Sequence, residues 1–163
     1  MQQLPHHYEV SASALPDGDV PLWSHGLPGL QTASPREFDG PGDRWSPETL
    51  LAGAVADCFI LTFRAVARAS KLTWHSLDCN ATATLDRVDG VTRFTQVHLH
   101  ANLMVPSGVD EALARRLLQK AEDRCLISRS LNATTHLEAR VIALPPGCGQ
   151  PLAAGAPGIR REV

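Results

Sequence analysis

Cys58 and Cys125 are the two residues whose type and setting could do chemistry in this chain. Cys58 lies inside a long apolar stretch, residues 46–59, and Cys125 closes a second helical stretch. A cysteine is a nucleophile only as the thiolate, and burial favours the neutral thiol. The pair is therefore either a reactive centre or two unrelated core side chains, and the pattern alone leaves both interpretations open.

The other two cysteines indicate no chemistry. Cys79 lies on the apolar side of a predicted strand, which is typical of an inert buried thiol, and Cys148 lies between two glycines as an incidental exposed thiol. The sequence has no Cys-x-x-Cys spacing, so neither a thioredoxin-type dithiol nor a zinc site is supported. The chain starts with no export signal, which favours free or catalytic thiols over a disulfide framework.

The helix that must position Cys58 is predicted from Ser46 to about Lys71. Ser46 can cap the free backbone N–H groups, and Pro47 suits the first helical position. Its polar residues form one narrow stripe on an otherwise apolar surface. The stripe consists of Asp57, Arg64, Arg68 and Lys71. We therefore expect the central helix of the fold, buried on most sides.

Glu48 lies on the opposite side of this helix from Asp57. An acid on a buried face is costly unless it is paired, so Glu48 is either a solvated first-turn acid or the partner of an arginine such as Arg36 or Arg44. Ten residues separate Glu48 from Cys58, about 15 Å along a straight helix. If both serve one site, a bridging arginine or a second chain must join them.

The remaining pattern predicts an α+β fold with antiparallel strands and segregated helices. A hairpin is expected around residues 8–22, a loop with room for one short strand over 24–45, and a final strand over 135–144. Two longer strands, residues 76–85 and 96–105, flank an Asp89-Gly90 turn, and a second helix follows over 109–125. Residues 1–144 form one predicted domain, and the Pro- and Gly-rich tail, 145–163, is predicted to be disordered.

Composition narrows the class of partner. The chain has 163 residues, 44% hydrophobic and 20% charged, with a net charge of −2 and no basic run. Nucleic acid and anionic membranes are therefore not expected as partners. The apolar stretch from Thr49 is interrupted at Asp57, which predicts that it is too short to span a bilayer. His98 and His100 could form half a metal site, but their alternation is typical of an exposed polar strand face.

Two motifs resemble the osmotically inducible protein C and organic hydroperoxide resistance (OsmC/Ohr) family. The first is Ser34-Pro-Arg-Glu-Phe38, a Gly-rich loop and then residues 46–59 with Pro47, Glu48 and Cys58. The second is Cys125-x-x-Ser128 ahead of the final strand. The resemblance covers residues 7–144. It implies antiparallel sheets around a long central helix, in an intertwined homodimer whose sites are each built from both chains.

The resemblance also implies a cytoplasmic thiol peroxidase that acts on organic hydroperoxides. Cys58 then is similar to the peroxidatic cysteine that becomes a sulfenic acid, and Cys125 to the resolving cysteine that forms a disulfide with it. Glu48 resembles the acid that orients an arginine beside the thiolate. A thiol or lipoyl-type reductant would reset the site, and no metal or organic cofactor is implied.

The sequence departs from the family pattern at the arginine. The first hairpin, residues 14–20, has none where the family commonly carries one, so Arg36 and Arg44 are the candidates. Asp57 and Leu126 also stand where the family usually has a small residue and a proline. These departures leave two alternatives open: a protein that binds a small ligand or senses redox state without turnover, and a structural dimer with two buried thiols.

Overall fold

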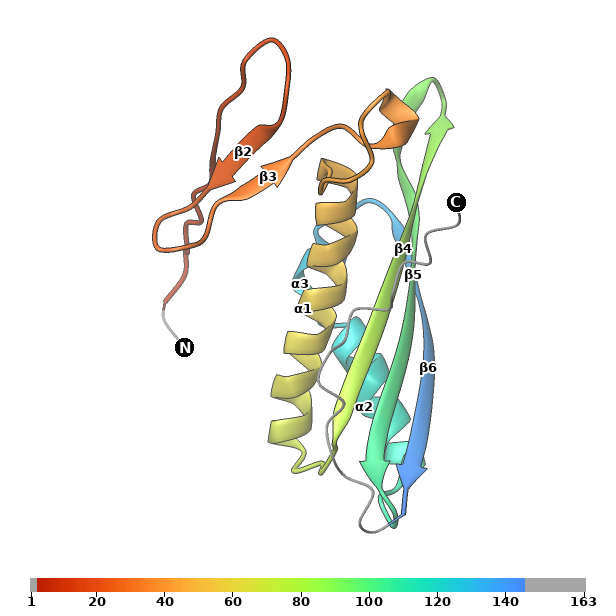
Figure 1. The fold of residues 1–163 in the computed structure, drawn as a ribbon. Coiled ribbons are helices and arrows are strands. Elements are labelled where there is room, and N and C mark those ends of the chain that lie inside the picture. The colour runs from red at the N-terminus through yellow and green to blue at the C-terminus, as the bar shows by residue number, and fades with distance from the viewer. Residues whose placement is uncertain (1–2, 146–163) are drawn as a thin grey trace. The chain divides into compact units, whose positions relative to one another are not determined.

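The computed structural model describes residues 3–145, and the chain divides into two compact units, Met1–Gly53 and Ala54–Val163. Cys148 and all but the first residue of the predicted tail lie outside the described residues. Figure 1 shows the elements of each unit.

The first unit holds a small three-stranded antiparallel sheet in the order β1-β2-β3. Its strands are β1 (Ser11–Ala12), β2 (Val20–Trp23) and β3 (Leu30–Thr32), followed by the short helix η1 (Arg36–Phe38). The predicted hairpin and the short strand in the loop are thus confirmed, although β1 is only two residues long. Nothing in the sequence pattern predicted η1.

The cap at Ser46 starts α1 (Pro47–Ala69) as predicted. The Thr49 N–H donates to Ser46 Oγ at 3.2 Å, and the Ser46 N–H donates to Thr49 Oγ1 at 2.8 Å. Two backbone donors that the helix cannot satisfy internally are therefore satisfied by two hydroxyls. This reciprocal cap fixes where the helix begins.

Only one face of α1 is buried, so the expectation of burial on most sides is wrong for the single chain. The buried residues are Val55, Phe59, Phe63, Val66 and Ala67. Leu61, by contrast, is 49% exposed, and the predicted polar stripe is exposed as well. The physical reason is that the second unit supplies one packing layer for this helix, which covers one side of a cylinder.

By length and composition alone, α1 could cross a membrane, so the sequence-based exclusion on length was wrong. This is weak evidence for a membrane span, because the core helix of a soluble protein passes the same test. Here the apolar stripe through Phe59 and Phe63 packs into the hydrophobic core of the second unit.

The main sheet has the order β4-β5-β6, with β5 in the middle. It is built from β4 (Ser76–Val88), β5 (Val91–Pro106) and β6 (Thr134–Leu144). Asp89 and Gly90 form the predicted tight turn with φ of 53° and 80°, the left-handed pair that a two-residue hairpin needs. β4 and β5 are antiparallel, but β6 runs parallel to β5, which corrects the all-antiparallel prediction.

The parallel pairing follows from the helices that separate β5 from β6. Such a crossover brings the chain back to the end of the sheet where β5 begins, so β6 runs in the same direction as β5. α2 (Glu111–Glu122) is capped by Asp110, whose carboxylate accepts hydrogen bonds from the N–H groups of Ala112 and Leu113. The helix was predicted to reach Cys125 but ends earlier. Cys125 adopts extended backbone angles and precedes a separate short helix, α3 (Leu126–Arg129).

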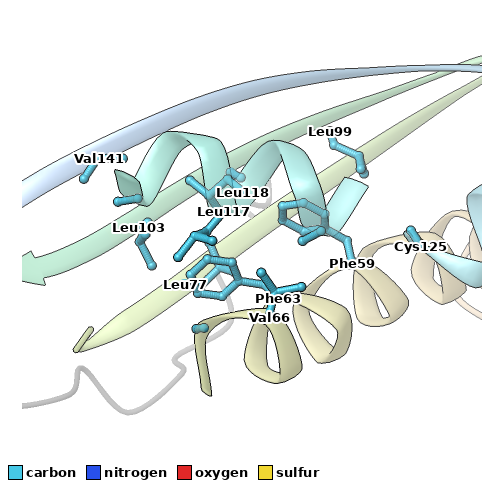
Figure 2. Close-up of a cluster of buried hydrophobic side chains, with 14 of the residues drawn as sticks. Phe59, Phe63, Val66, Leu77, Leu99, Leu103, Leu117, Leu118, Cys125 and Val141 are labelled. Atoms are coloured by element: carbon cyan, nitrogen blue, oxygen red, sulfur yellow. The ribbon is translucent and has the colours of Figure 1, made fainter. Parts of the chain in front are cut away.

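The hydrophobic core of the second unit lies between α1, α2 and the inner face of the sheet. Figure 2 shows Phe59 and Phe63 of α1 directed towards Leu117 and Leu118 of α2. The inward side chains predicted for β5 are all buried: Val97, Leu99, Ala101, Leu103 and Val105. Cys58 and Cys79 pack against the edge of this cluster, and Cys125 belongs to it.

Candidate active site

Cys58 lies midway along α1 and is half-buried. Its Sγ lies 4.0 Å from Oγ1 of Thr62, one helical turn further on. The hydroxyl can donate to the sulfur once the thiol has lost its proton, because a thiolate has only acceptor capacity. A half-buried sulfur with a polar neighbour has the exposure that a reagent needs to reach it.

Cys125 lies against the turn of α1 that precedes Cys58. It is fully buried, and its Sγ donates a weak hydrogen bond to the carbonyl oxygen of Val55 at 3.9 Å. Val55 and Cys58 are three residues apart and therefore share a helix face. The structure thus brings together the two cysteines on which the sequence interpretation depends.

Burial is the largest cause that raises the pKa of the Cys125 thiol. Cys58 raises that pKa further, through a hydrogen bond and through charge, while the hydroxyl and N–H of Ser128 oppose the rise. An influence through both a hydrogen bond and charge requires close neighbours, so the side chains of Cys58 and Cys125 lie near one another.

Cys79 lies on β4 close to the same cluster. Burial, followed by the charge on Cys125, raises the pKa of Cys79 to about 11. Cys79 therefore stays a protonated thiol near neutral pH. This agrees with the inert thiol predicted from its place on the apolar side of the strand, although its side chain is only partly buried.

Glu48 lies in the first turn of α1, and its Oε2 is buried without a hydrogen-bond partner. The alternative of a fully solvated first-turn acid is therefore wrong. The alternative of an acid paired with an arginine is not realised within residues 3–145 of one chain. A buried carboxylate oxygen without a donor is costly, so this position calls for a cation that residues 3–145 do not supply.

Of the two candidate arginines, Arg44 is already engaged. Its Nε donates to Asp19 at 2.9 Å, and its Nη1 lies 3.1 Å from a carboxylate oxygen of Asp43. The hydrogen bond to Asp19 is the main cause that raises the pKa of Arg44. Asp19 belongs to the first hairpin. This segment has no arginine of its own, but its Asp19 binds Arg44.

Arg36 is placed differently, because its Cγ, Cδ and Nε pass over Gly42. Its side chain lies directly over Gly42, where a Cβ would overlap the Arg36 chain, and Gly42 has a φ of +74°. Glycine is required there both for the left-handed backbone and for the close approach. Among the described residues, no acceptor bonds the Arg36 guanidinium. Arg36 therefore offers a guanidinium that bonds no acceptor in the described part of the chain.

The histidines on β5 form a polar outer face, as predicted. His98 Nε2 lies 3.3 Å from Gln96 Oε1, and its ring stacks on that of His136 at 4.9 Å. His100 Nδ1 lies 3.2 Å from Glu138 Oε2. Within the described part of the chain, no three side chains of the metal-ligating types are grouped so that they could hold an ion.

The model of the OsmC-like protein family matches residues 40–140 of this chain. The chain belongs to this family. It is 34% identical over 107 residues to the uncharacterized protein YmaD of Bacillus subtilis, a match that covers 64% of this chain and 71% of YmaD. It is 31% identical over 93 residues to peroxiredoxin OsmC of Escherichia coli, with 57% of this chain and 64% of that protein covered.

Among solved structures, the fold is similar to that of an organic hydroperoxide resistance protein OsmC from Legionella pneumophila. The TM-score is 0.68 at 26% identity, and the match covers 86% of this chain and all of that one. The predicted OsmC/Ohr fold is thus confirmed. The family includes a peroxiredoxin and organic hydroperoxide resistance proteins, as well as uncharacterized members.

Two polar residues of the cluster carry no role in the sequence interpretation. Thr62 lies next to Cys58, and Ser128 lies next to Cys125. A spacing of four residues within one helix could have pointed to Thr62. Ser128 stands inside the second motif, but only the break between α2 and α3 makes its position significant.

Proposed function

We propose that this OsmC-like protein is a thiol peroxidase that reduces organic hydroperoxides with Cys58 as the nucleophile and Cys125 as the resolving thiol. One observation carries the proposal: Cys125 bonds Val55 in the turn of α1 that precedes Cys58, and it lies close enough to Cys58 for that residue to raise the pKa of the Cys125 thiol. The contact joins two segments that are far apart in the sequence, with 67 positions between the two cysteines (125 − 58).

In the first step, the Cys58 thiolate attacks the terminal oxygen of the hydroperoxide. The S–O bond forms as the O–O bond breaks, and the alkoxide takes up a proton and leaves as the alcohol. Cys58 becomes a sulfenic acid. Thr62 Oγ1 is the neighbouring donor for the thiolate before the attack. The apolar residues around Cys58 favour a substrate with an organic group over hydrogen peroxide.

In the second step, the Cys125 sulfur attacks the sulfenic sulfur of Cys58. The S–S bond forms, and the hydroxyl group leaves with the Cys125 proton as water. A thiolate at Cys58 raises the pKa of Cys125, whereas a sulfenic acid is neutral. Oxidation of Cys58 therefore removes one of the causes that raise the pKa of Cys125, while the larger cause, burial, stays in place.

A thiol or lipoyl-type dithiol then reduces the disulfide by exchange and is itself oxidised. The arginine beside the site is Arg36, because its guanidinium is uncommitted and Arg44 is engaged by two carboxylates. Glu48 orients that arginine, and its unpartnered oxygen supports this role. In this proposal the working protein is a cytoplasmic homodimer, and a second chain brings the arginine and the acid to the thiol.

Peroxide consumption by single-cysteine variants tests this proposal. Reduced protein is mixed with tert-butyl hydroperoxide and the remaining peroxide is measured over time. Cys58→Ser should consume none above background. Wild type and Cys125→Ser should each consume one equivalent, but Cys125→Ser should retain a Cys58 sulfenic acid where the wild type forms the disulfide. Cys79→Ser is the matched control, because it removes a neighbouring thiol, and it should behave as the wild type. Consumption by Cys58→Ser at the wild-type rate would contradict the mechanism.

The second candidate function is ligand binding or redox sensing without turnover. The engagement of Arg44 by Asp19 favours it, because one of the two arginines that could stand beside the thiol is then committed elsewhere. The same experiment separates the two functions. If an alkylating agent modifies Cys58 but the protein leaves the hydroperoxide intact in the presence of excess dithiol, the protein binds or senses and does not turn over.

A further inference from the structure

We propose that Ser128 is a positioning residue for the resolving cysteine: its buried hydroxyl donates to the sulfur of Cys125 as that sulfur gives up its proton. The inference rests on the proposed function, because it assigns the group that prepares Cys125 for the second step. It concerns a residue that touches neither the peroxide nor Cys58 in the reactions described above.

The first observation is an orphaned hydroxyl. Ser128 is only 6% exposed, and its Oγ is buried without a hydrogen-bond partner. Buried hydroxyls are nearly always hydrogen-bonded, since an unpaired one costs free energy. An exception beside a reactive group therefore requires an explanation. Here the acceptor would be the sulfur of Cys125 as a thiolate, which exists only after the thiol has lost its proton.

The second observation is the local backbone. Cys125 is the N-cap residue of α3, and Ser128 is the third residue that follows it. At this spacing the N–H of the later residue faces back towards the side chain of the cap. The Cys125 side chain nevertheless makes no cap hydrogen bond as a neutral thiol. Its proton goes to the carbonyl oxygen of Val55 instead.

The two observations fit together once the thiol is deprotonated. A thiolate can no longer donate to the Val55 carbonyl and needs donors in a buried setting, where the unpaired charge is costly. Ser128 brings two donors, its N–H and its hydroxyl, and both lower the pKa of Cys125 against the effect of burial. The hydroxyl is free to rotate towards the sulfur because nothing else holds it.

The reaction itself is unchanged by this assignment. Cys125 attacks the Cys58 sulfenic acid, the S–S bond forms, and the hydroxyl group leaves as water with the Cys125 proton. Ser128 neither gains nor loses a proton overall. It lowers the cost of the negative charge that develops on Cys125 before the attack.

The experiment is a single-turnover oxidation of wild type, Ser128→Ala, Ser128→Thr and Ser130→Ala. Ser130 is the matched control, because it lies in the same segment, is exposed, and already bonds its hydroxyl to the carbonyl oxygen of Leu126 at 2.8 Å. After one equivalent of tert-butyl hydroperoxide, a sulfenic-acid probe reports the first step and mass spectrometry reports the disulfide.

Ser128→Ala should form the sulfenic acid at the wild-type rate and the disulfide roughly tenfold more slowly, the effect of one lost hydrogen bond to a charged group. The pH profile of disulfide formation should move to higher pH. Ser128→Thr should restore the rate, and Ser130→Ala should leave it unchanged. Disulfide formation in Ser128→Ala at the wild-type rate, or an equal loss in Ser130→Ala, would overturn the inference.

A titration separates this inference from the proposed function. In a Cys58→Ser, Cys79→Ser, Cys148→Ser background, the ultraviolet absorbance of the thiolate reports Cys125 alone. Adding Ser128→Ala should raise the pKa of Cys125, and an unmoved pKa would overturn the inference. A raised pKa together with a wild-type protein that never oxidises would instead reject the peroxidase function. Thermal stability should not fall in Ser128→Ala, because an unpartnered hydroxyl is lost, whereas a purely structural role would predict a loss.

Discussion

The two units of this chain bury their apolar residues very differently. All the buried hydrophobic residues among the described ones lie between Val55 and Val141, in the second unit. The first unit buries only Thr32 and Ser46 to a comparable degree, and leaves several large side chains exposed. These are Leu4, Tyr8, Val10, Leu15, Trp23, Leu27, Phe38 and Trp45, between 45% and 87% exposed.

The difference indicates that a hydrophobic core of its own stabilises the second unit, whereas the first unit has no such core among the described residues. A sheet of nine strand residues (2 + 4 + 3) that buries no hydrophobic side chain gains little from the hydrophobic effect. Trp23 lies in a strand of this sheet and the other seven side chains lie outside its strands, and clustered exposed apolar side chains are typical of a protein–protein interface. The second unit is thus the stable platform for the thiols, and the proposed homodimer is tested by whether the first unit depends on a second chain.

The sharpest test of this difference in the second unit is Phe59→Ala. Phe59 is fully buried in the core, so its truncation removes apolar contacts and leaves a cavity. The free energy of unfolding should fall by about 3–5 kcal/mol. Urea denaturation of the purified protein measures it. A change within the error of the titration would contradict the assignment of the core.

The first unit should instead contribute chemistry through Arg36. Replacing its guanidinium in Arg36→Met should lower the rate of Cys58 oxidation on the order of 10²-fold, as for the loss of one preorganised donor. Arg44→Met is the matched control, because Arg44 is committed to Asp19, and its oxidation rate should stay near that of the wild type. Stopped-flow measurement with a hydroperoxide compares them. The reverse ranking would assign the role to Arg44.

A smaller effect is expected from Trp23→Ala, again in the first unit. Trp23 is 45% exposed in the single chain, so its truncation should hardly alter the core of the second unit. If a second chain covers it, the loss of an aromatic anchor should weaken the dimer by about 2 kcal/mol. Sedimentation velocity over a range of protein concentrations measures this. Val91→Ala, at an exposed hairpin end of the second unit, is the control that should leave the dimer intact.

The smallest predicted effect is a pH dependence from Cys79. Burial raises the pKa of Cys79 from 9.0 to about 11, so the unfolded chain loses this proton at a lower pH than the folded one. The unfolded state therefore binds fewer protons between these values, and the free energy of unfolding should fall as pH rises from 9 towards 11. Cys79→Ala should remove this part of the slope. Equal slopes in denaturation series of both proteins would contradict the burial of this thiol.

The sequence predicted best where one pattern acts alone. The alternation of β5 and the Asp89-Gly90 turn are set by local rules, and the structure confirms both. The cap at Ser46 is equally local. The direction of β6 was predicted wrongly. Alternation fixes which face of the sheet a residue occupies, but it does not indicate whether a neighbouring strand runs parallel or antiparallel.

The site was less predictable because it depends on contacts between distant segments. Cys58 and Cys125 stood out by type, but only the break between α2 and α3 reveals why Ser128 matters. The partial burial of α1 could not be predicted either, since composition does not say how many layers cover a helix. The choice of arginine needed the Asp19 contact, which joins residues 25 positions apart.

The central claim is that Cys58 and Cys125 form one redox centre, and disulfide mapping tests it most directly. Fully reduced protein is treated with one equivalent of an organic hydroperoxide, quenched with an alkylating agent and digested for mass spectrometry. The account predicts a Cys58–Cys125 disulfide within one chain, with Cys79 recovered as the alkylated thiol. Oxidation that leaves Cys58 and Cys125 both alkylated, or that links either of them mainly to Cys79, would contradict it.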